Sequence, residues 1–221
     1  MEKPALSLID RLLVTPAVGH DLYDKGEFVY KAGEPARNIH LLKSGIILTR
    51  QDNVEESCIS DIVRAGEIFG IDSLHSPERY TSAQADTEVE IATIPVRKLA
   101  AICSAYPKMA LPFFQLLAEA YRRLEEHNTV IKNGQAKNKI ASALIEFSEG
   151  QDINVQHWKL AARTSINRVT ATKVMAELAE EGLILATGLA QYKILEEKSF
   201  TELAHPKMKL VDRNIKRNGQ E

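Results

Sequence analysis

The segment 155–184 constrains the fold of this chain more than any other stretch, because it predicts two short amphipathic helices that meet at a tight turn. Two helices that cross steeply must bury apolar side chains where they touch and keep a small residue where their backbones approach. Ala161 is the small residue at that approach. The apolar positions are Leu160, Ile166, Ala171 and Val174. The sequence therefore predicts a helix-turn-helix.

The second of these helices carries a basic and hydroxyl-bearing stripe that suits the major groove of DNA. Asn167 is a predicted N-cap, which places Arg168 in the first helical turn. Arg and Lys side chains can donate to O6 and N7 of guanine, and Val169 can contact a thymine methyl. Threonine hydroxyls can anchor a phosphate or touch a base. The expected DNA-contacting residues are Ser165, Asn167, Arg168, Val169, Thr170, Thr172 and Lys173.

Charge and the neighbouring sequence bear on this interpretation. Between Asp152 and Glu177 the chain has no acid, a local potential that suits a polyanion. The basic residues there are Lys159, Arg163, Arg168 and Lys173. Taken alone, the segment fits an amphipathic hairpin with a solvated basic face even better, because motif matches give false positives. Two alternating apolar runs around Gly188 change that balance, since they predict a β-hairpin of wing size and hence a winged helix.

The winged-helix segment resembles the C-terminal domain of the CRP/FNR family of bacterial transcription regulators, and the features upstream follow the family's order over nearly the whole chain. Residues 168–173, Arg-Val-Thr-Ala-Thr-Lys, are most similar to the recognition helices of the nitrogen-control, NtcA-like members. Val169 stands where CRP and FNR usually have Glu, so neither a CRP-type nor an FNR-type half-site is implied. Ser165 replaces a Gly that is common in the turn, which leaves the geometry of the turn open.

The region from about Gly19 to Ile94 predicts an antiparallel β-roll. Short apolar segments are separated by turn residues and glycines at the spacing of a small barrel or jelly roll. This region resembles the cyclic-nucleotide-binding-type roll of the same family. A metal-binding cupin is the alternative, but His40 has no His-x-His pair or carboxylate set beside it, so we expect no metal site.

The stretch 66–85 would carry the effector site that the resemblance implies. In cyclic-AMP-binding relatives, a Glu after the second Gly holds the ribose, an Arg before Ser or Thr holds the phosphate, and two hydroxyls of the central helix reach the adenine. Here Ile71 follows Gly70, and 124–125 is Leu-Glu. Arg79 either binds an anion or is a surface charge. We expect an effector other than cyclic AMP, near Phe69, Gly70, Ile71, Arg79, Thr81, Ser82, Leu124 and Glu125.

Other effectors known in the family leave the sensed molecule unidentified. An iron-sulfur cluster of the FNR type needs several cysteines, and this chain has only Cys58 and Cys103. Haem-containing members place a His ligand where Asp72 stands, and His75 lies three residues later, so a haem is open but unsupported. Nitrogen-control members bind 2-oxoglutarate partly through an Arg that aligns with Ala120. The cofactor is therefore unknown.

Residues 108–133 predict the longest helix of the chain. Positions spaced alternately by three and four form an a/d seam of the kind that pairs two helices. The seam consists of Phe114, Leu117, Tyr121, Leu124, Asn128 and Ile131. A polar residue such as Asn128 at an a position favours a parallel dimer. We expect a homodimer, since a two-fold reader needs recognition helices about 34 Å apart; alternatively, this face merely packs on the roll.

These parts predict an α+β protein in three regions. Residues 1–106 would form a β-roll sensor domain, with a short helix at 6–14. Residues 107–134 would form a dimerisation helix that ends at a Gly134 hinge, and residues 135–221 a winged-helix DNA-binding domain with a tail, 196–221, that shows no clear pattern. The expected partners are double-stranded DNA with a palindromic site, a second copy of the chain, RNA polymerase and an unidentified small effector.

The composition is that of an ordinary globular protein. The chain has 221 residues, of which 44% are hydrophobic and 26% charged, enough for two modest domains. With no long apolar run and no secretory layout at 1–16, we expect a cytoplasmic protein without a membrane partner. Motifs for an enzyme are lacking. Two rivals remain: an effector-independent regulator, and a ligand-binding module whose winged helix mediates protein contacts.

Overall fold

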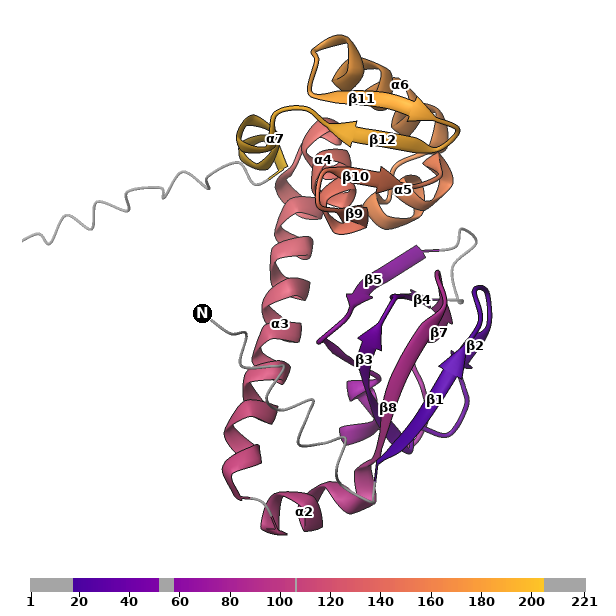
Figure 1. Cartoon of the computed structure of the whole chain (residues 1–221), viewed down its shortest axis with the longest axis vertical. Helices are drawn as coiled ribbons and strands as arrows, with labels where there is room; N and C mark the ends of the chain where they lie inside the picture. The colour runs from indigo at the N-terminus through magenta and orange to yellow at the C-terminus, as the bar shows by residue number, and fades with distance from the viewer. Residues whose placement is uncertain (1–17, 52–57, 106, 205–221) are drawn as a thin grey trace, which may run out of the picture.

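A computed structural model describes residues 18–51, 58–105 and 107–204 (Figure 1). These residues form a β-roll, a long helix along one side of it, and a smaller domain of helices with a small sheet. The helix expected at 6–14 lies outside the described residues. None of the helices in the described part of the chain combines the length and the apolar character of a membrane-spanning segment. The predicted class, an α+β chain with an antiparallel roll and a C-terminal winged helix, is confirmed.

The roll consists of two four-stranded sheets with strand orders β1-β8-β3-β6 and β2-β7-β4-β5. All neighbouring strands are antiparallel. Their bounds are β1 Gly19–Tyr23, β2 Phe28–Tyr30, β3 Asn38–Ser44, β4 Ile46–Gln51, β5 Cys58–Arg64, β6 Ile68–Phe69, β7 Ser82–Ala85 and β8 Val89–Pro95. Buried β-branched and leucine side chains, such as Ile47, Val63 and Ile91, fill the core between the strands. Gly45 is required at the β3–β4 turn, since its φ is +85° and a Cβ would lie 2.2 Å from the Glu88 carbonyl oxygen.

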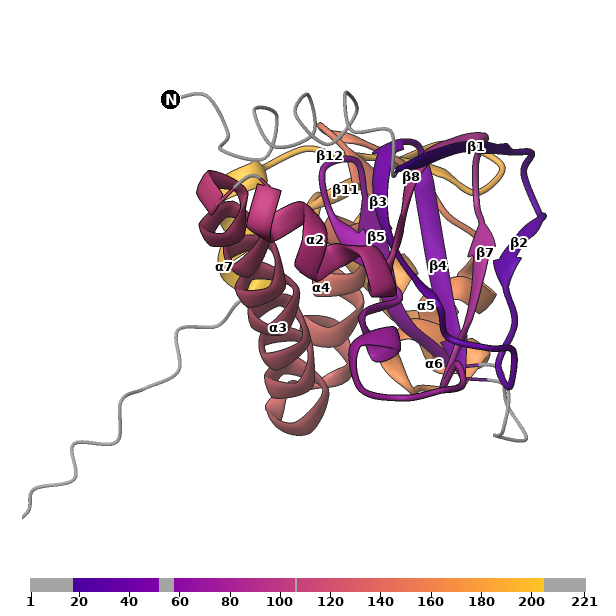
Figure 2. The ribbon, with the colours of Figure 1, turned by 90° about the horizontal axis from the view of Figure 1, so that it is seen from below.

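A long helix connects the roll to the C-terminal domain (Figures 1 and 2). The connecting elements are η1 Ile71–Leu74, α2 Val96–Ala105, η2 Pro107–Met109 and α3 Ala110–Asn133. One face of α3 packs on the roll, because Phe113 and Ala120 are buried in the same cluster as Ile39 and Ile68. Pro112 falls in the first turn of α3, where a missing N–H costs least.

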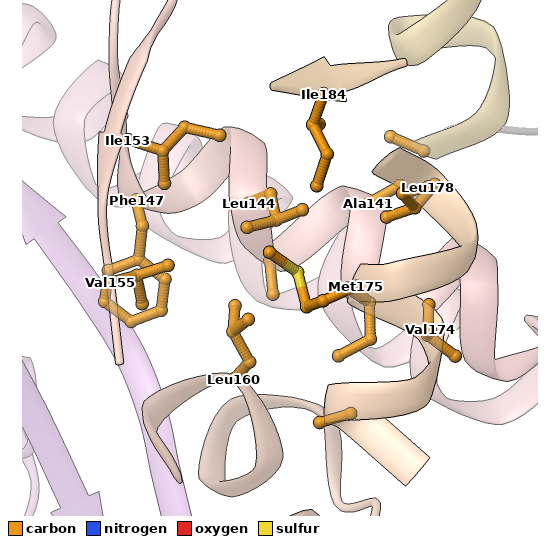
Figure 3. Close-up of a cluster of buried hydrophobic side chains, with 14 of the residues drawn as sticks. Ala141, Leu144, Phe147, Ile153, Val155, Leu160, Val174, Met175, Leu178 and Ile184 are labelled. Carbon is orange, nitrogen blue, oxygen red and sulfur yellow. The ribbon is translucent and has the colours of Figure 1, made fainter. Parts of the chain in front are cut away.

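The C-terminal domain has the order expected of a winged helix. Its elements are α4 Ala136–Phe147, β9 Ser148–Glu149, β10 Asp152–Asn154, α5 His157–Thr164, α6 Arg168–Glu180, β11 Ile184–Gly188, β12 Gln191–Ile194 and α7 Glu197–Ala204. Figure 3 shows Leu144, Leu160, Met175 and Leu178 meeting in its core. The expected packing positions Leu160, Ala171 and Val174 are buried and Ile166 is half-buried, which confirms the predicted helix-turn-helix.

Helix α7 lies within the 196–221 segment, whose sequence shows no clear pattern. Phe200 is only 1% exposed and belongs to the same core as α4. The side-chain amide of Asn138, in α4, donates to the Leu203 carbonyl at 2.8 Å. The first part of the tail therefore completes the C-terminal domain.

The C-terminal domain is docked on the roll through a buried arginine. The Arg163 side chain, 3% exposed, donates from Nε to Glu146 Oε2 at 2.6 Å and from Nη1 to the Ser60 carbonyl at 2.5 Å. In the opposite direction, Arg64 of β5 donates to the carbonyls of Ile145 and Glu146. Lys159 pairs with Asp86 of the roll. Apolar residues of β4 and β5 also join the core of the C-terminal domain.

Acid titration should reveal the ion pair between Glu146 and Arg163. Burial alone would raise the pKa of Glu146, but its hydrogen bond with His127 and the charge of Arg163 outweigh burial and lower that pKa to about 2. Because folding lowers the pKa, the ionised Glu146 stabilises the fold above the ordinary Glu pKa of about 4.3, and this contribution is lost as the pH falls through about 2. We expect Glu146→Gln to lower the free energy of unfolding at pH 7 by about 3 kcal/mol, since Arg163 keeps a buried, uncompensated charge.

Urea unfolding at several pH values measures this effect. The difference in the free energy of unfolding between the wild type and Glu146→Gln should be fully present at pH 5 and should shrink toward pH 2. Glu202→Gln is the matched control, because Glu202 is exposed and has no ion pair within the described ranges. A difference that stays constant down to pH 2, or an equal loss in the control, would contradict the assignment.

Candidate nucleic-acid interface and effector cavity

The turn before α6 has the geometry that a reading helix needs. Asn167 is extended, and its Oδ1 accepts a hydrogen bond from the Thr170 backbone N–H at 2.8 Å, so the predicted N-cap is confirmed. Ser165 has φ 54° and ψ 38°, the left-handed conformation that favours Gly. The turn thus keeps its shape, at a conformational cost of about 1 kcal/mol for the side chain.

The expected stripe lies on the outer face of α6. Arg168, Thr172 and Lys173 are exposed, Val169 is 81% exposed, and Thr170 is half-buried. Burial of Ala171, Val174, Met175 and Leu178 on the opposite side fixes this orientation. Arg168 and Lys173 make no ion pair within the described residues, so their charges are available to a polyanion.

Two of the four basic residues expected to favour a polyanion have a different role. Arg163 is buried against Glu146 and the roll, and Lys159 pairs with Asp86. The positive surface is therefore narrower than the sequence indicates and centres on Arg168 and Lys173. No spacing in the sequence reveals this, because Asp86 and Ser60 come from the other domain.

The residues of the expected dimer seam of α3 lie in two different environments: some are exposed, and others pack against the roll. Phe114 and Tyr121 are each 64% exposed, and Leu111 on the same side is 67% exposed. Leu117 packs against the core of the roll, and Leu124 lines a cavity beside it. The remaining seam positions are Asn128, which is exposed, and Ile131, which is half-buried. Packing on the roll thus accounts for part of the seam and leaves an apolar stripe of α3 uncovered in the single chain.

A cavity of about 230 Å³ lies between the roll and α3. Of the expected effector residues, five line it: Phe69, Gly70, Ile71, Thr81 and Leu124. Arg79, Ser82 and Glu125 do not. The Ser82 hydroxyl accepts from the Ala32 backbone N–H, and Glu125 accepts from the Tyr121 hydroxyl on the exposed side of α3.

The charges that face the cavity are carboxylates. The charged residues of its lining are Asp61 and Asp72, and both are paired with arginines that lie outside that lining. The rest of the lining is mainly apolar or hydroxyl-bearing, with Tyr30, Thr49, Ser60, Ile68, Tyr80 and Ala120.

Arg79 is a buried structural residue, so its interpretation as a surface charge is wrong. It is 4% exposed, and its Nη1 donates to the Gly70 carbonyl at 2.8 Å and to Asp72 Oδ1 at 2.7 Å. Its Nη2 donates to the Asn38 carbonyl, and the guanidinium lies 4.0 Å from the centre of the Tyr30 ring. A Cβ on Gly70 would lie 2.7 Å from Nη1, so this position needs glycine.

His40 belongs to the same buried cluster. Its ring stacks with Phe69 and Tyr30, with centroids 5.0 and 5.7 Å apart. Burial first, and then the charge of Arg79, lower the pKa of His40 to about 3, so the imidazole is neutral. Its Nδ1 lies 3.2 Å from Thr93 Oγ1, and its Nε2 lies 3.3 Å from Arg79 Nη2. These contacts make His40 a core residue; within the described ranges, no group of three or more His, Cys, Asp or Glu is placed to hold a metal.

Comparisons with known proteins agree with this arrangement. Residues 21–106 match the family model of the cyclic nucleotide-binding domain. The transcriptional regulator SdrP of Thermus thermophilus is 31% identical over 194 residues, covering 82% of this chain and 92% of the relative. A solved CRP/FNR-family regulator from Thermus thermophilus has a TM-score of 0.65 at 29% identity, covering 84% and 98% of the two chains. FixK2 from Bradyrhizobium japonicum shares the fold, with a TM-score of 0.73 at 16% identity, covering 84% and 96%.

Proposed function

Because this chain belongs to the CRP/FNR family of transcription regulators, we propose that it binds DNA as a homodimer and reads a palindromic site with α6. The observation that carries this proposal is the outward stripe of Arg168, Val169, Thr172 and Lys173 on an N-capped helix. Val169 offers a methyl contact where a Glu would accept from cytosine N4. Together with Arg168 and Lys173, it favours a half-site of the NtcA-like type.

Replacing Arg168 tests the reading helix. A bidentate contact of Arg with guanine discriminates by about 1–3 kcal/mol, so Arg168→Ala should weaken specific binding by that amount and relax the preference at one base pair. Selection from random duplexes and titration of the selected site measure both effects. Arg97→Ala is the control, since Arg97 is an exposed arginine of α2. An unchanged site preference in Arg168→Ala would refute the role.

The dimer would form through the uncovered stripe of α3. Leu111, Phe114 and Tyr121 expose apolar surface on one side of a helix whose other side already packs on the roll. A second copy of the same stripe covers such a surface by a self-complementary contact. The two-fold arrangement would place two copies of α6 on successive turns of one duplex face.

A charge placed in this stripe of α3 should disrupt the homodimer. Phe114→Glu should give a monomer in light scattering and lose the high-affinity complex, because a buried carboxylate without a partner opposes association. Leu22→Glu, at a 79% exposed position of β1, is the control and should stay dimeric. A wild-type protein that is monomeric at all concentrations, or a Phe114→Glu variant that remains dimeric, would contradict the proposal.

The cavity between the roll and α3 is the proposed effector site, and its chemistry disfavours anions. The guanidinium of Arg79 is already bonded to Asp72, and the charged groups of the lining are carboxylates. A cyclic nucleotide or 2-oxoglutarate would lack a cationic partner there. We infer that the effector is a small uncharged or cationic molecule. An effector-independent regulator is the second candidate, favoured by the small volume and the internal pairing of Arg79.

Two expectations from the family resemblance stay proposals without further support. RNA polymerase as a partner rests on the resemblance alone. The contacts near Asp72 do not favour a haem ligand there, since Asp72 pairs with Arg79 and the exposed His75 ring lies edge-on against Tyr80.

Calorimetry tests the ligand class. Cyclic AMP and 2-oxoglutarate, each titrated into the full chain, should give no saturable heat, because Arg79, the residue expected to bind an anion, is already paired with Asp72. Saturable binding of either compound at micromolar concentration would contradict the inference. Binding that appears only in Asp72→Ala, where Arg79 loses its internal carboxylate, would support it.

Signal transfer would change the contacts that dock the C-terminal domain. The Gly134 N–H donates to the Val130 carbonyl at 2.8 Å, and a Cβ on Gly134 would lie 2.6 Å from that oxygen. The junction between α3 and α4 therefore needs glycine. Rotation about this junction would break the hydrogen bonds that Arg163 and Arg64 make between the roll and the C-terminal domain. An effector would act by changing the free energy of these bonds relative to a second arrangement.

A further inference from the structure

Three side chains from three elements of the winged helix form a continuous chain of hydrogen bonds beside the exposed stripe. His157 opens α5, Thr172 begins the second turn of α6, and Tyr192 is on β12 of the wing. The Nδ1 atom of His157 lies 2.9 Å from Thr172 Oγ1, and its Nε2 atom lies 2.7 Å from the Tyr192 hydroxyl. The two rings also stack, with centroids 6.1 Å apart. One imidazole thus joins the wing to the reading helix.

The positions of the hydrogens in this chain follow from the donors and acceptors present. Thr172 Oγ1 donates its single hydrogen to the Arg168 carbonyl at 3.0 Å, because a carbonyl can only accept. Toward His157, the Thr172 hydroxyl can therefore only accept, so Nδ1 carries the imidazole hydrogen. A neutral imidazole has one N–H, so Nε2 accepts from the Tyr192 hydroxyl. Each hydrogen bond in this series then has one defined donor and one defined acceptor.

The surroundings favour this neutral form. Partial burial and then the positive charge of Arg168, on α6, lower the pKa of His157. Burial also raises the pKa of Tyr192, on β12, which keeps its hydroxyl protonated and able to donate. Thr172, the third contact, carries no charge.

These hydrogen bonds determine which groups of Thr172 are left to contact DNA. Its hydroxyl hydrogen is committed to the Arg168 carbonyl, and one oxygen lone pair is committed to His157 Nδ1. What is left for a base pair is the methyl group and one lone pair. A threonine fixed in this way discriminates bases by apolar contact with a thymine methyl or by accepting from an amino group, and does not donate to a phosphate.

We propose that His157, held by Tyr192, is a positioning residue of DNA reading that fixes Thr172 so that its methyl side and its free lone pair meet the base pairs. The proposal rests on the proposed function, in which α6 enters the major groove. It adds a residue of α5 to the determinants of sequence preference, although His157 itself need not touch a base.

Two amide variants separate the two ring nitrogens. His157→Asn can keep an N–H donor near the place of Nδ1, and so the bond to Thr172. His157→Gln can keep a polar group near the place of Nε2, and so the bond to Tyr192, while Nδ1 is lost. Because both variants carry the same amide group, a general loss of folding would affect both. Thr172→Val removes the hydroxyl and keeps the shape.

Site preference should change at one base pair only. With random-duplex selection and titration of the selected site, His157→Gln should lose discrimination about three- to tenfold at the base pair next to Thr172, the loss expected for one hydrogen bond. His157→Asn should keep the wild-type preference. Thr172→Val should lose at least as much discrimination, because it removes the free lone pair as well as the link to His157. Adding His157→Gln to Thr172→Val should cause no further loss, since the link is already broken. The salt dependence of binding should stay the same, because no phosphate contact is removed.

The outcomes that overturn the inference differ from those that overturn the proposed function. If the wild type selects a site and His157→Gln keeps its full preference, the positioning role is wrong although α6 reads DNA. Equal losses in His157→Asn and His157→Gln would show a packing role alone and would also overturn it. If the wild type selects no site from random duplexes, the proposed function fails, and the inference fails with it.

Discussion

The packing of α6 is the constraint on which the proposed function depends. Ala171, Val174, Met175 and Leu178 are buried in one core with α4 and α5, so the rotation of α6 about its axis is fixed by apolar burial. At about 25 cal/mol per Å² of apolar surface, turning this helix would cost several kcal/mol. The same burial holds residues 168, 169, 172 and 173 outward, which is why a short stretch of sequence can carry a reading surface.

Two buried arginines link elements that lie far apart in the sequence. Arg79 joins η1, β3 and the strand region around Tyr30 inside the roll, and Arg163 joins the C-terminal domain to β5. A buried guanidinium needs both a counter-charge and hydrogen-bond acceptors, and Asp72 and Glu146 supply the counter-charges. These pairs change the functional interpretation, because neither arginine is free to bind an anion. Of the four basic residues between Asp152 and Glu177, Arg168 and Lys173 make no ion pair within the described residues, and both lie on the face of α6 that would meet DNA.

Much of the fold could be predicted because it depends on local patterns. The spacing of Leu160, Ala171 and Val174 predicts the helix-turn-helix, and Asn167 marks the start of α6; both agree with the structure. The roles of Arg79 and Arg163 could not be predicted, since each depends on partners from other elements that the fold brings together. Helix α7 was missed, although Phe200, Leu203 and Ala204 have helical spacing, because a short polar segment at the end of a chain gives a weak signal. The exposed and buried halves of the α3 seam likewise depend on where the roll packs.

In the proposed complex, two copies of α6 enter successive major grooves of one duplex. A hydroxyl-radical footprint of the full-length protein on its selected site tests this most directly. We expect two protected regions, related by a dyad and centred about 10 base pairs apart on one face of the duplex. A single protected region, or protection without a dyad, would contradict it.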